Sequence, residues 1–135
     1  MRKKHFFIAG IALLCLAGRI LYVVYEPHRD VREKRADLKI SAEQLCGQYQ
    51  SDEKGANKKF LNKVLEVKGL LQSFDRTDTS AVAELKGEGP AGVSCSLSRS
   101  GTRPGSFPAI NTRVTVKGRC AGFLLDVVLV DAVFE

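Results

Sequence analysis

The sequence contains no tryptophan and only two histidines, and these absences bear on which functions are possible. Both histidines, His5 and His28, lie outside the region with the pattern of a folded domain. The four cysteines form no Cys-x-x-Cys pair, and no His-x-x-x-His or clustered carboxylate pattern indicates a metal site. There is also no glycine-rich phosphate loop between a strand and a helix, and no nucleophile elbow. We therefore expect a protein that is not an enzyme and that uses no cofactor.

Positive charge is concentrated at the amino terminus. The chain has 135 residues and a formal net charge of +6, of which +4 belongs to the first 37 residues, with eight basic and four acidic side chains. A basic chain often binds nucleic acid or an anionic surface. Here most of the excess lies in a segment with the composition of a targeting or anchoring element, so it says little about the domain that follows.

Residues 1–25 have the pattern of an uncleaved membrane anchor. Three basic residues at positions 2–4 precede an apolar run from Phe6 to Tyr25, which is interrupted only by Arg19. As a helix, this run of 20 residues spans about 30 Å, the thickness of a bilayer core. Arg19 lies near the end of the run, where its side chain can extend to the membrane interface. The sequence therefore predicts a transmembrane helix and membrane contact through residues 6–25.

Two alternatives remain open for this segment. A cleaved signal peptide also fits, because Cys15-Leu16-Ala17 loosely resembles a small-x-small cleavage site. A lipoprotein signal would place lipid on Cys15, although Leu14 occupies the position where that processing needs a small residue. Basic residues on both sides of the run leave its orientation undecided. We favour a signal anchor in the inner (cytoplasmic) membrane, crossing once, with the domain in the periplasm or otherwise outside the cytoplasm.

A charged linker and an amphipathic helix follow the anchor. Residues 26–37 are short of large apolar side chains, and Pro27 ends the preceding helix. Ser41 is a suitable helix N-cap, with Gln44 three residues later as in a capping box. Apolar residues then recur at helical spacing from Ala42 to Tyr49, a stripe that should pack on the domain. Residues 52–59 are predicted to form the loop after this helix.

The remaining sequence predicts five strands. An alternating motif that ends in glycine occurs twice, at Leu65–Gly69 and Val114–Gly118, and indicates half-buried strands that bend or admit a close neighbour. We expect strands at residues 63–74, 80–85, 92–98, 113–123 and 125–134, with a helical turn at 107–110. This order predicts a mainly β domain over residues 38–135, a five-stranded oligonucleotide/oligosaccharide-binding (OB) fold barrel preceded by the amphipathic helix. A small open sandwich is the alternative.

Several segments of the sequence together resemble the bacterial tRNA-anti-like family. They are Pro27–Asp30, Ile40–Leu45, Ala56–Phe60, Val64–Gly69, Val93–Cys95, Val116–Cys120 and Asp126–Leu129. The resemblance covers residues 26–134 and implies a small OB-fold protein behind a membrane or lipoprotein signal. The motifs concern structure rather than chemistry, so the resemblance adds no catalytic residue.

The candidate ligand face consists of polar and basic side chains. They are Lys68, Lys86, Ser94, Ser96, Ser98, Arg99 and Arg103. Strand alternation places the serines on the outer side of the third strand, next to the loop from Ser98 to Ser106. The same alternation points Cys95 and Cys120 inward. These two cysteines either form a disulfide in an oxidising compartment or pack as two buried thiols.

Two functions fit these observations. We favour a membrane-tethered binding module of the cell envelope, with a protein or a small ligand as its partner. The alternative is an OB-fold protein that binds single-stranded nucleic acid, such as tRNA or an oligonucleotide. Such proteins combine a positive groove with aromatic side chains that stack on bases. The predicted second and third strands contain no aromatic residue, and residues 38–135 have only +2 of the net charge.

Overall fold

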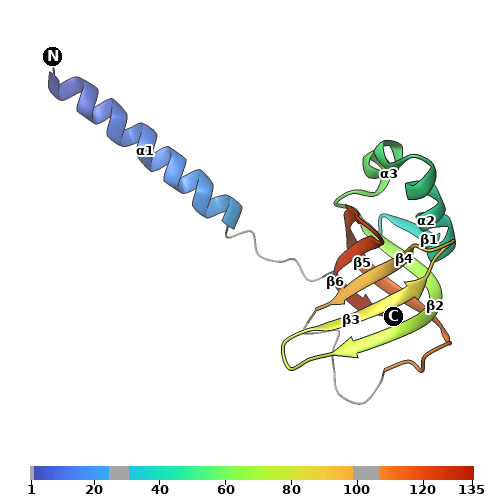
Figure 1. The fold of residues 1–135 in the computed structure, drawn as a ribbon. Coiled ribbons are helices and arrows are strands. Elements are labelled where there is room, and N and C mark those ends of the chain that lie inside the picture. The colour runs from blue at the N-terminus through green and yellow to red at the C-terminus, as the bar shows by residue number, and fades with distance from the viewer. Residues whose placement is uncertain (1, 25–30, 99–106) are drawn as a thin grey trace.

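The computed structural model describes residues 2–24, 31–98 and 107–135. Figure 1 shows an amino-terminal helix, α1 (Arg2–Val24), and a separate compact domain. The domain contains β1 (Leu38–Ser41), α2 (Ala42–Ser51), α3 (Glu53–Phe60), β2 (Val64–Arg76), β3 (Ala81–Lys86), β4 (Gly92–Leu97), β5 (Arg113–Phe123) and β6 (Val127–Phe134). Within the described part of the chain, no helix combines the length and the apolar character needed to cross a membrane.

The five longer strands close into a barrel. β2 pairs with β3 and β3 with β4 in antiparallel fashion, while β4 runs parallel to β6, and β6 is antiparallel to β5. The first half of β2 then pairs with β5, from Val64 opposite Arg119 to Leu70 opposite Arg113, and completes the circle. This closed five-stranded barrel is consistent with the predicted OB fold and not with the open sandwich.

The strand predictions agree with the structure to within two residues at each end. The difference between prediction and structure that bears most on function is at the β5–β6 connection. The strand predicted at 125–134 begins only at Val127, because Leu124 and Leu125 belong to the hairpin turn. The predicted helical turn at 107–110 is instead a tight turn in which the Thr112 N–H donates to the Ala109 carbonyl over 3.3 Å. The short strand β1, parallel to the start of β2, was not predicted.

The helix α2 forms as its sequence predicts. The Ser41 hydroxyl accepts a hydrogen bond from the Gln44 N–H at 3.2 Å, so the predicted N-cap is confirmed. The four buried side chains of α2 belong to the barrel core: Ala42, Leu45, Cys46 and Tyr49. The amphipathic stripe therefore docks the helix onto the barrel.

The predicted loop at residues 52–59 is wrong, because most of it forms α3. The carboxylate of Asp52 caps this helix by accepting from the Gly55 N–H at 3.1 Å. Ala56 and Phe60, one helical turn apart, are both buried. Gly55 and Asn57 made this stretch resemble a loop, but the cap and the buried pair outweigh their low helix propensity.

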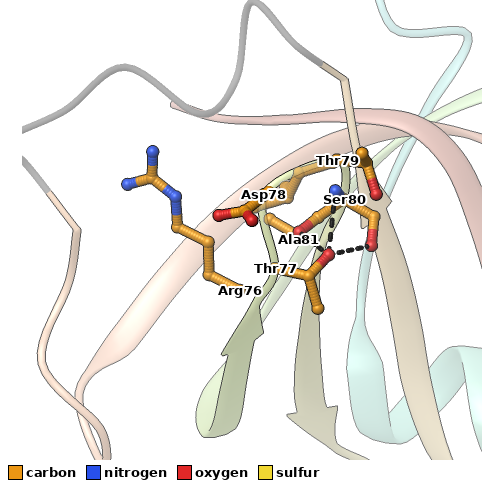
Figure 2. Close-up of a pocket in the computed structure, with 7 residues that line it drawn as sticks. Arg76, Thr77, Asp78, Thr79, Ser80 and Ala81 are labelled. Atoms are coloured by element: carbon orange, nitrogen blue, oxygen red, sulfur yellow. Dashed lines mark hydrogen bonds between the residues drawn. The ribbon is translucent and has the colours of Figure 1, made fainter.

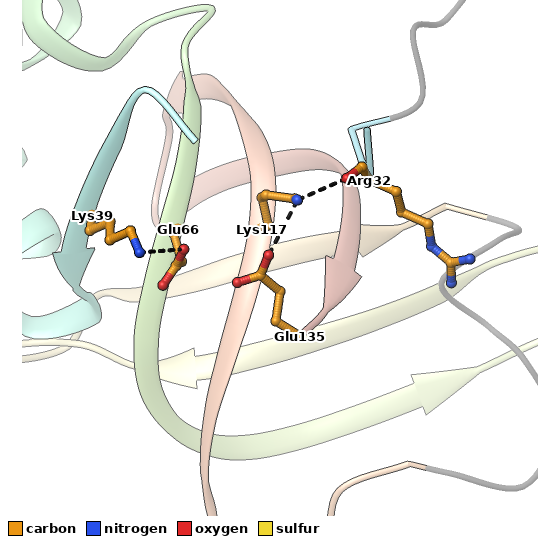
Figure 3. A network of polar contacts seen from close by, with 5 residues as sticks. All are labelled: Arg32, Lys39, Glu66, Lys117 and Glu135. Carbon is orange, nitrogen blue, oxygen red and sulfur yellow. Dashed lines mark hydrogen bonds and ion pairs between the residues drawn. The ribbon is translucent and has the colours of Figure 1, made fainter. Parts of the chain in front are cut away.

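The second half of the predicted linker packs against the barrel. Val31 is buried, and the carbonyl of Arg32 accepts a hydrogen bond from Lys117 Nζ at 3.1 Å. Lys117 is only 9% exposed and also pairs with the Glu135 carboxylate at 3.2 Å, as Figure 3 shows. The Asp37 N–H donates to the Val64 carbonyl at 2.7 Å, and the Asp37 carboxylate accepts from the Val64 N–H at 2.9 Å. Residues 31–37 of the predicted linker therefore also contact the barrel.

The two glycines of the repeated motif explain why the repeat is present. A Cβ atom placed on Gly69 would lie 2.8 Å from the Cβ of Ala42, so this glycine lets α2 approach the sheet. A Cβ on Gly118 would lie 3.1 Å from the Cβ of Leu129 and 3.2 Å from that of Ala132, on the neighbouring strand β6. Each glycine thus permits a close approach inside the curled sheet.

Gly69→Ala is expected to lower the free energy of unfolding by about 1–3 kcal/mol, because the added methyl overpacks the contact with Ala42. Urea unfolding followed by circular dichroism measures this loss. Ser96→Ala, on the exposed face of β4, is the control and should change stability by less than about 0.5 kcal/mol. Equal stability of the Gly69→Ala variant and the unchanged chain would contradict the proposed close approach.

Candidate functional site

The outer face of β3 and β4 is a polar surface. Ala83 and Cys95 point into the core as a pair, as do Leu85 and Val93. The alternate pairs face outward, and they join Val82 with Ser96, Glu84 with Ser94, and Lys86 with Gly92. The predicted outward position of the serines is therefore confirmed for Ser94 and Ser96.

A carboxylate lies in the middle of this face. The hydroxyl of Ser73 on β2 donates to Glu84 Oε2 at 2.8 Å, which joins three strands into one polar row with Ser94. Lys86 lies exposed at the end of β3, so the face carries charges of both signs. Neither β3 nor β4 contains an aromatic residue. The surface is suited to hydrogen bonding rather than to the stacking of bases.

A shallow cavity of about 350 Å³ adjoins this face at the turn between β3 and β4. Its polar lining includes Gln72, Glu84, Lys86 and Asp126. Asp126, from the β5–β6 hairpin, accepts a hydrogen bond from the Gly92 N–H at 2.8 Å and so joins that hairpin to the start of β4. The volume lies at the lower end of the range for small-molecule sites.

A smaller cavity of about 170 Å³ lies at the turn between β2 and β3. Figure 2 shows that Thr77 and Ser80 form hydrogen bonds with each other there. Their hydroxyl oxygens lie 2.9 Å apart, and the Ser80 N–H donates to Thr77 Oγ1 at 3.1 Å. The Arg76 guanidinium lies 5.5 Å from the centre of the Phe107 ring. The hydroxyls of Thr77 and Ser80 are therefore occupied by contacts within the turn itself.

The structure brings together only part of the predicted ligand face. Lys86, Ser94 and Ser96 lie on it, and Ser98 follows β4, half-buried, with its N–H donating to the Ala132 carbonyl at 2.9 Å. Lys68 does not belong to this face, because the first half of β2 pairs with β1 and β5 and only the second half with β3. Arg99, Arg103 and most of the loop 98–106 lie outside the described residues.

Glu84, Ser73, Gln72 and Asp126 were not predicted as site residues. Strand alternation could have indicated Glu84, since it lies two residues from Lys86 on the same strand. Ser73, Gln72 and Asp126 reach the site from other strands and turns, so only the register of the sheet reveals them.

Cys95 and Cys120 are buried, free thiols. Each lies opposite Leu129, so β6 separates the two strands that carry them. Two strand spacings amount to about 9–10 Å, whereas a disulfide joins Cα atoms roughly 4.4–6.8 Å apart. Of the two alternatives from the sequence, the structure contains the pair of buried thiols and not the disulfide.

Burial favours the neutral form of two cysteines, Cys46 and Cys95. Burial raises the pKa of Cys95 to about 12, and burial likewise raises that of Cys46. The Tyr49 hydroxyl lies 3.3 Å from Cys120 Sγ, and the Tyr49 ring stacks on the Phe123 ring with the two ring centres 5.6 Å apart. Burial, followed by this hydrogen bond, raises the pKa of Tyr49. A thiol with a raised pKa is a poor nucleophile, so Cys46 and Cys95 have a packing role.

Comparison with known proteins identifies one family. The model of the tRNA_anti-like family matches residues 1–133, which include both the amino-terminal segment and almost all of the barrel. No curated protein and no solved structure matches the chain. The family match agrees with the resemblance that the sequence motifs indicate.

The raised pKa of Cys95 predicts a loss of stability in alkaline solution. The folded thiol stays protonated up to a pKa of about 12, while the unfolded thiol ionises near its ordinary value of 9.0. The stabilisation is therefore complete below pH 9 and is lost as the pH rises toward 12. Urea unfolding at a series of pH values should show a smaller alkaline loss for Cys95→Ala than for the unchanged chain. Identical slopes for the two proteins would contradict the assignment.

Proposed function

Because the chain belongs to the tRNA_anti-like family and folds as a closed OB-type barrel, we propose that it is a non-enzymatic binding module held at a membrane. The partner contacts the outer face of β3 and β4. The observation that carries this proposal is the row of Ser73, Glu84 and Ser94 across three adjacent strands, next to a polar cavity of about 350 Å³. Such a row offers hydrogen-bond donors and acceptors on a rigid sheet.

The chemistry of this face favours a polar protein segment or a small polar ligand of the cell envelope. Ser94 and Ser96 can each donate and accept, Glu84 accepts, and Lys86 donates. Single-stranded nucleic acid fits less well, because a carboxylate lies in the middle of the face and neither strand has an aromatic side chain. Repulsion between Glu84 and phosphate would weaken such binding.

The tether is proposed from the sequence of the amino-terminal segment. The run from Phe6 to Tyr25 contains a single charged residue, Arg19. Leu13 and Leu14 are 73% and 79% exposed on α1, and a bilayer would cover such side chains. We also propose that the amino terminus lies in the cytoplasm and the barrel outside it, as in a signal anchor.

A photo-crosslinking residue in place of Ser96, in the full chain in its native membranes, should form a discrete adduct with the partner. The control places the same residue at Lys68, which is exposed on another side of the barrel and should form no such adduct. Adding Glu84→Lys to the Ser96 probe should reduce the adduct roughly tenfold, because a charged hydrogen-bonding group is reversed. Equal adducts from both positions would contradict the assigned face. An adduct that nuclease destroys would instead support nucleic-acid binding.

A reporter enzyme that is active only outside the cytoplasm, fused after Glu135, should be active in whole cells. A second fusion with a reporter active only in the cytoplasm serves as the matched control and should be inactive. This expectation follows from the signal-anchor order of the segment, a basic start before an apolar run, since the count of basic residues on its two sides does not decide the orientation. The opposite pair of activities would place the barrel in the cytoplasm and contradict the proposed orientation.

A further inference from the structure

Three leucines are exposed together at one end of the barrel. Leu124 and Leu125, in the β5–β6 turn, are 83% and 88% exposed, and Leu61, after α3, is 38% exposed. Leu61 lies beside this hairpin, since its Cδ1 is 3.7 Å from the position of a Cβ on Gly122. We call Leu61, Leu124 and Leu125 the leucine tip. Removing apolar side chains from water is favourable, so a partner that covers these leucines would gain binding free energy from their burial.

Exposed lysines flank the leucine tip. Lys58 and Lys59 lie in the last turn of α3, and Lys63 precedes β2. Backbone hydrogen bonds from Asn62 N–H to the Cys120 carbonyl, 2.8 Å, and from Cys120 N–H to the Lys63 carbonyl, 2.9 Å, hold this stretch against the end of β5. Figure 1 shows α3 next to that end of the barrel. We call Lys58, Lys59 and Lys63 the lysine rim.

Among the described residues, Asp126 in the hairpin turn and Glu53 in α3 are the acidic side chains of the segments that carry the leucine tip and the lysine rim. Asp126, the carboxylate within the hairpin turn, accepts the Gly92 N–H at 2.8 Å and is only partly exposed. Glu53 lies in the first turn of α3, at the opposite end of that helix from Lys58 and Lys59. The leucine tip is therefore an apolar projection with positive charge beside it.

We propose that the leucine tip enters the interfacial region of an anionic lipid bilayer while the lysine rim contacts the lipid headgroups. An interfacial contact of this kind combines apolar side chains below the headgroups with lysines at their level. A nucleic acid would satisfy the lysines and leave the leucines in water. A second copy of the chain would bring two lysine rims together, and such like-charge contact is unfavourable.

The length of the connection to α1 is compatible with this placement. Seven peptide units join Val24 to Val31 and span at most about 25 Å. Arg32 is fixed against Lys117, and the seven residues from Lys117 to Leu124 along β5 measure about 23 Å. A chain anchored by α1 can therefore bring the leucine tip to the same membrane surface. This placement rests on the proposed tether.

The absence of tryptophan from the sequence allows a direct test with the full chain in lipid vesicles. Leu124→Trp introduces a single tryptophan at the leucine tip, and Ile110→Trp, an exposed position beyond the other end of β5, is the matched control. In vesicles that contain phosphatidylglycerol, the tip tryptophan should emit at shorter wavelength and be quenched by lipids with brominated chains. The control tryptophan should keep the emission of a residue in water.

Neutralising the lysine rim should weaken this contact. Each of Lys58→Gln, Lys59→Gln and Lys63→Gln should reduce the ratio of inserted to free tips roughly fivefold. Adding Leu125→Ser to the Leu124→Trp variant should also reduce quenching of the tryptophan by brominated lipid.

Several results would overturn the membrane contact. A tryptophan at position 124 that keeps the emission of a residue in water would contradict it. Quenching of this tryptophan that is as strong in purely zwitterionic vesicles as in anionic ones would also contradict it. So would quenching of the Ile110→Trp control that equals quenching of the tip tryptophan. Blue-shifted emission without quenching by brominated lipid would show that protein, such as a second copy, covers the tip. Flotation of the full chain with vesicles tests the tether separately, because an α1 that anchors the chain would make it float whether or not the tip enters the lipid. A chain that floats with its tip in water would overturn only the tip contact, and a chain that does not float would overturn the tether.

Discussion

Closure of the barrel between β2 and β5 is the constraint on which the other features of the domain depend. Seven residue pairs, from Val64–Arg119 to Leu70–Arg113, join these strands. The closed sheet must curl tightly, and Gly69 and Gly118 remove the side chains that α2 and β6 would otherwise meet. Because β2 is shared among β1, β3 and β5, its two halves belong to different sides of the barrel. That division separates Lys68 from the polar face.

The β5–β6 hairpin links the leucine tip to the polar outer face of β3 and β4. Asp126 belongs to the turn that exposes Leu124 and Leu125, and its carboxylate bonds to the Gly92 N–H at the start of β4. Asp126 also lines the polar cavity beside Glu84 and Lys86. A membrane that holds the tip would therefore hold the outer face of β3 and β4 at a defined height above the lipid. A partner bound to that face would lie close to the membrane surface.

The sequence predicted the parts of the fold that depend on local patterns. Alternation located the five barrel strands, and Ser41 located the start of α2 because its hydroxyl caps a helix within three residues of itself. Predictions failed where a local signal was weak or ambiguous. Gly55 and Asn57 concealed α3, and β1 was too short to detect. The apolar character of Leu125 extended the predicted last strand into a turn.

The composition and pattern of the sequence by themselves determined the strand content, the inward and outward sides of each strand, and the apolar character of residues 6–25. Only the tertiary structure decided which strands are neighbours. Register places β6 between Cys95 and Cys120, and it brings Ser73 to Glu84. It also places Leu61 beside the hairpin that bears the other two exposed leucines. These pairings join residues far apart in the chain, and the energy that selects them comes from burying the whole core at once rather than from any short segment.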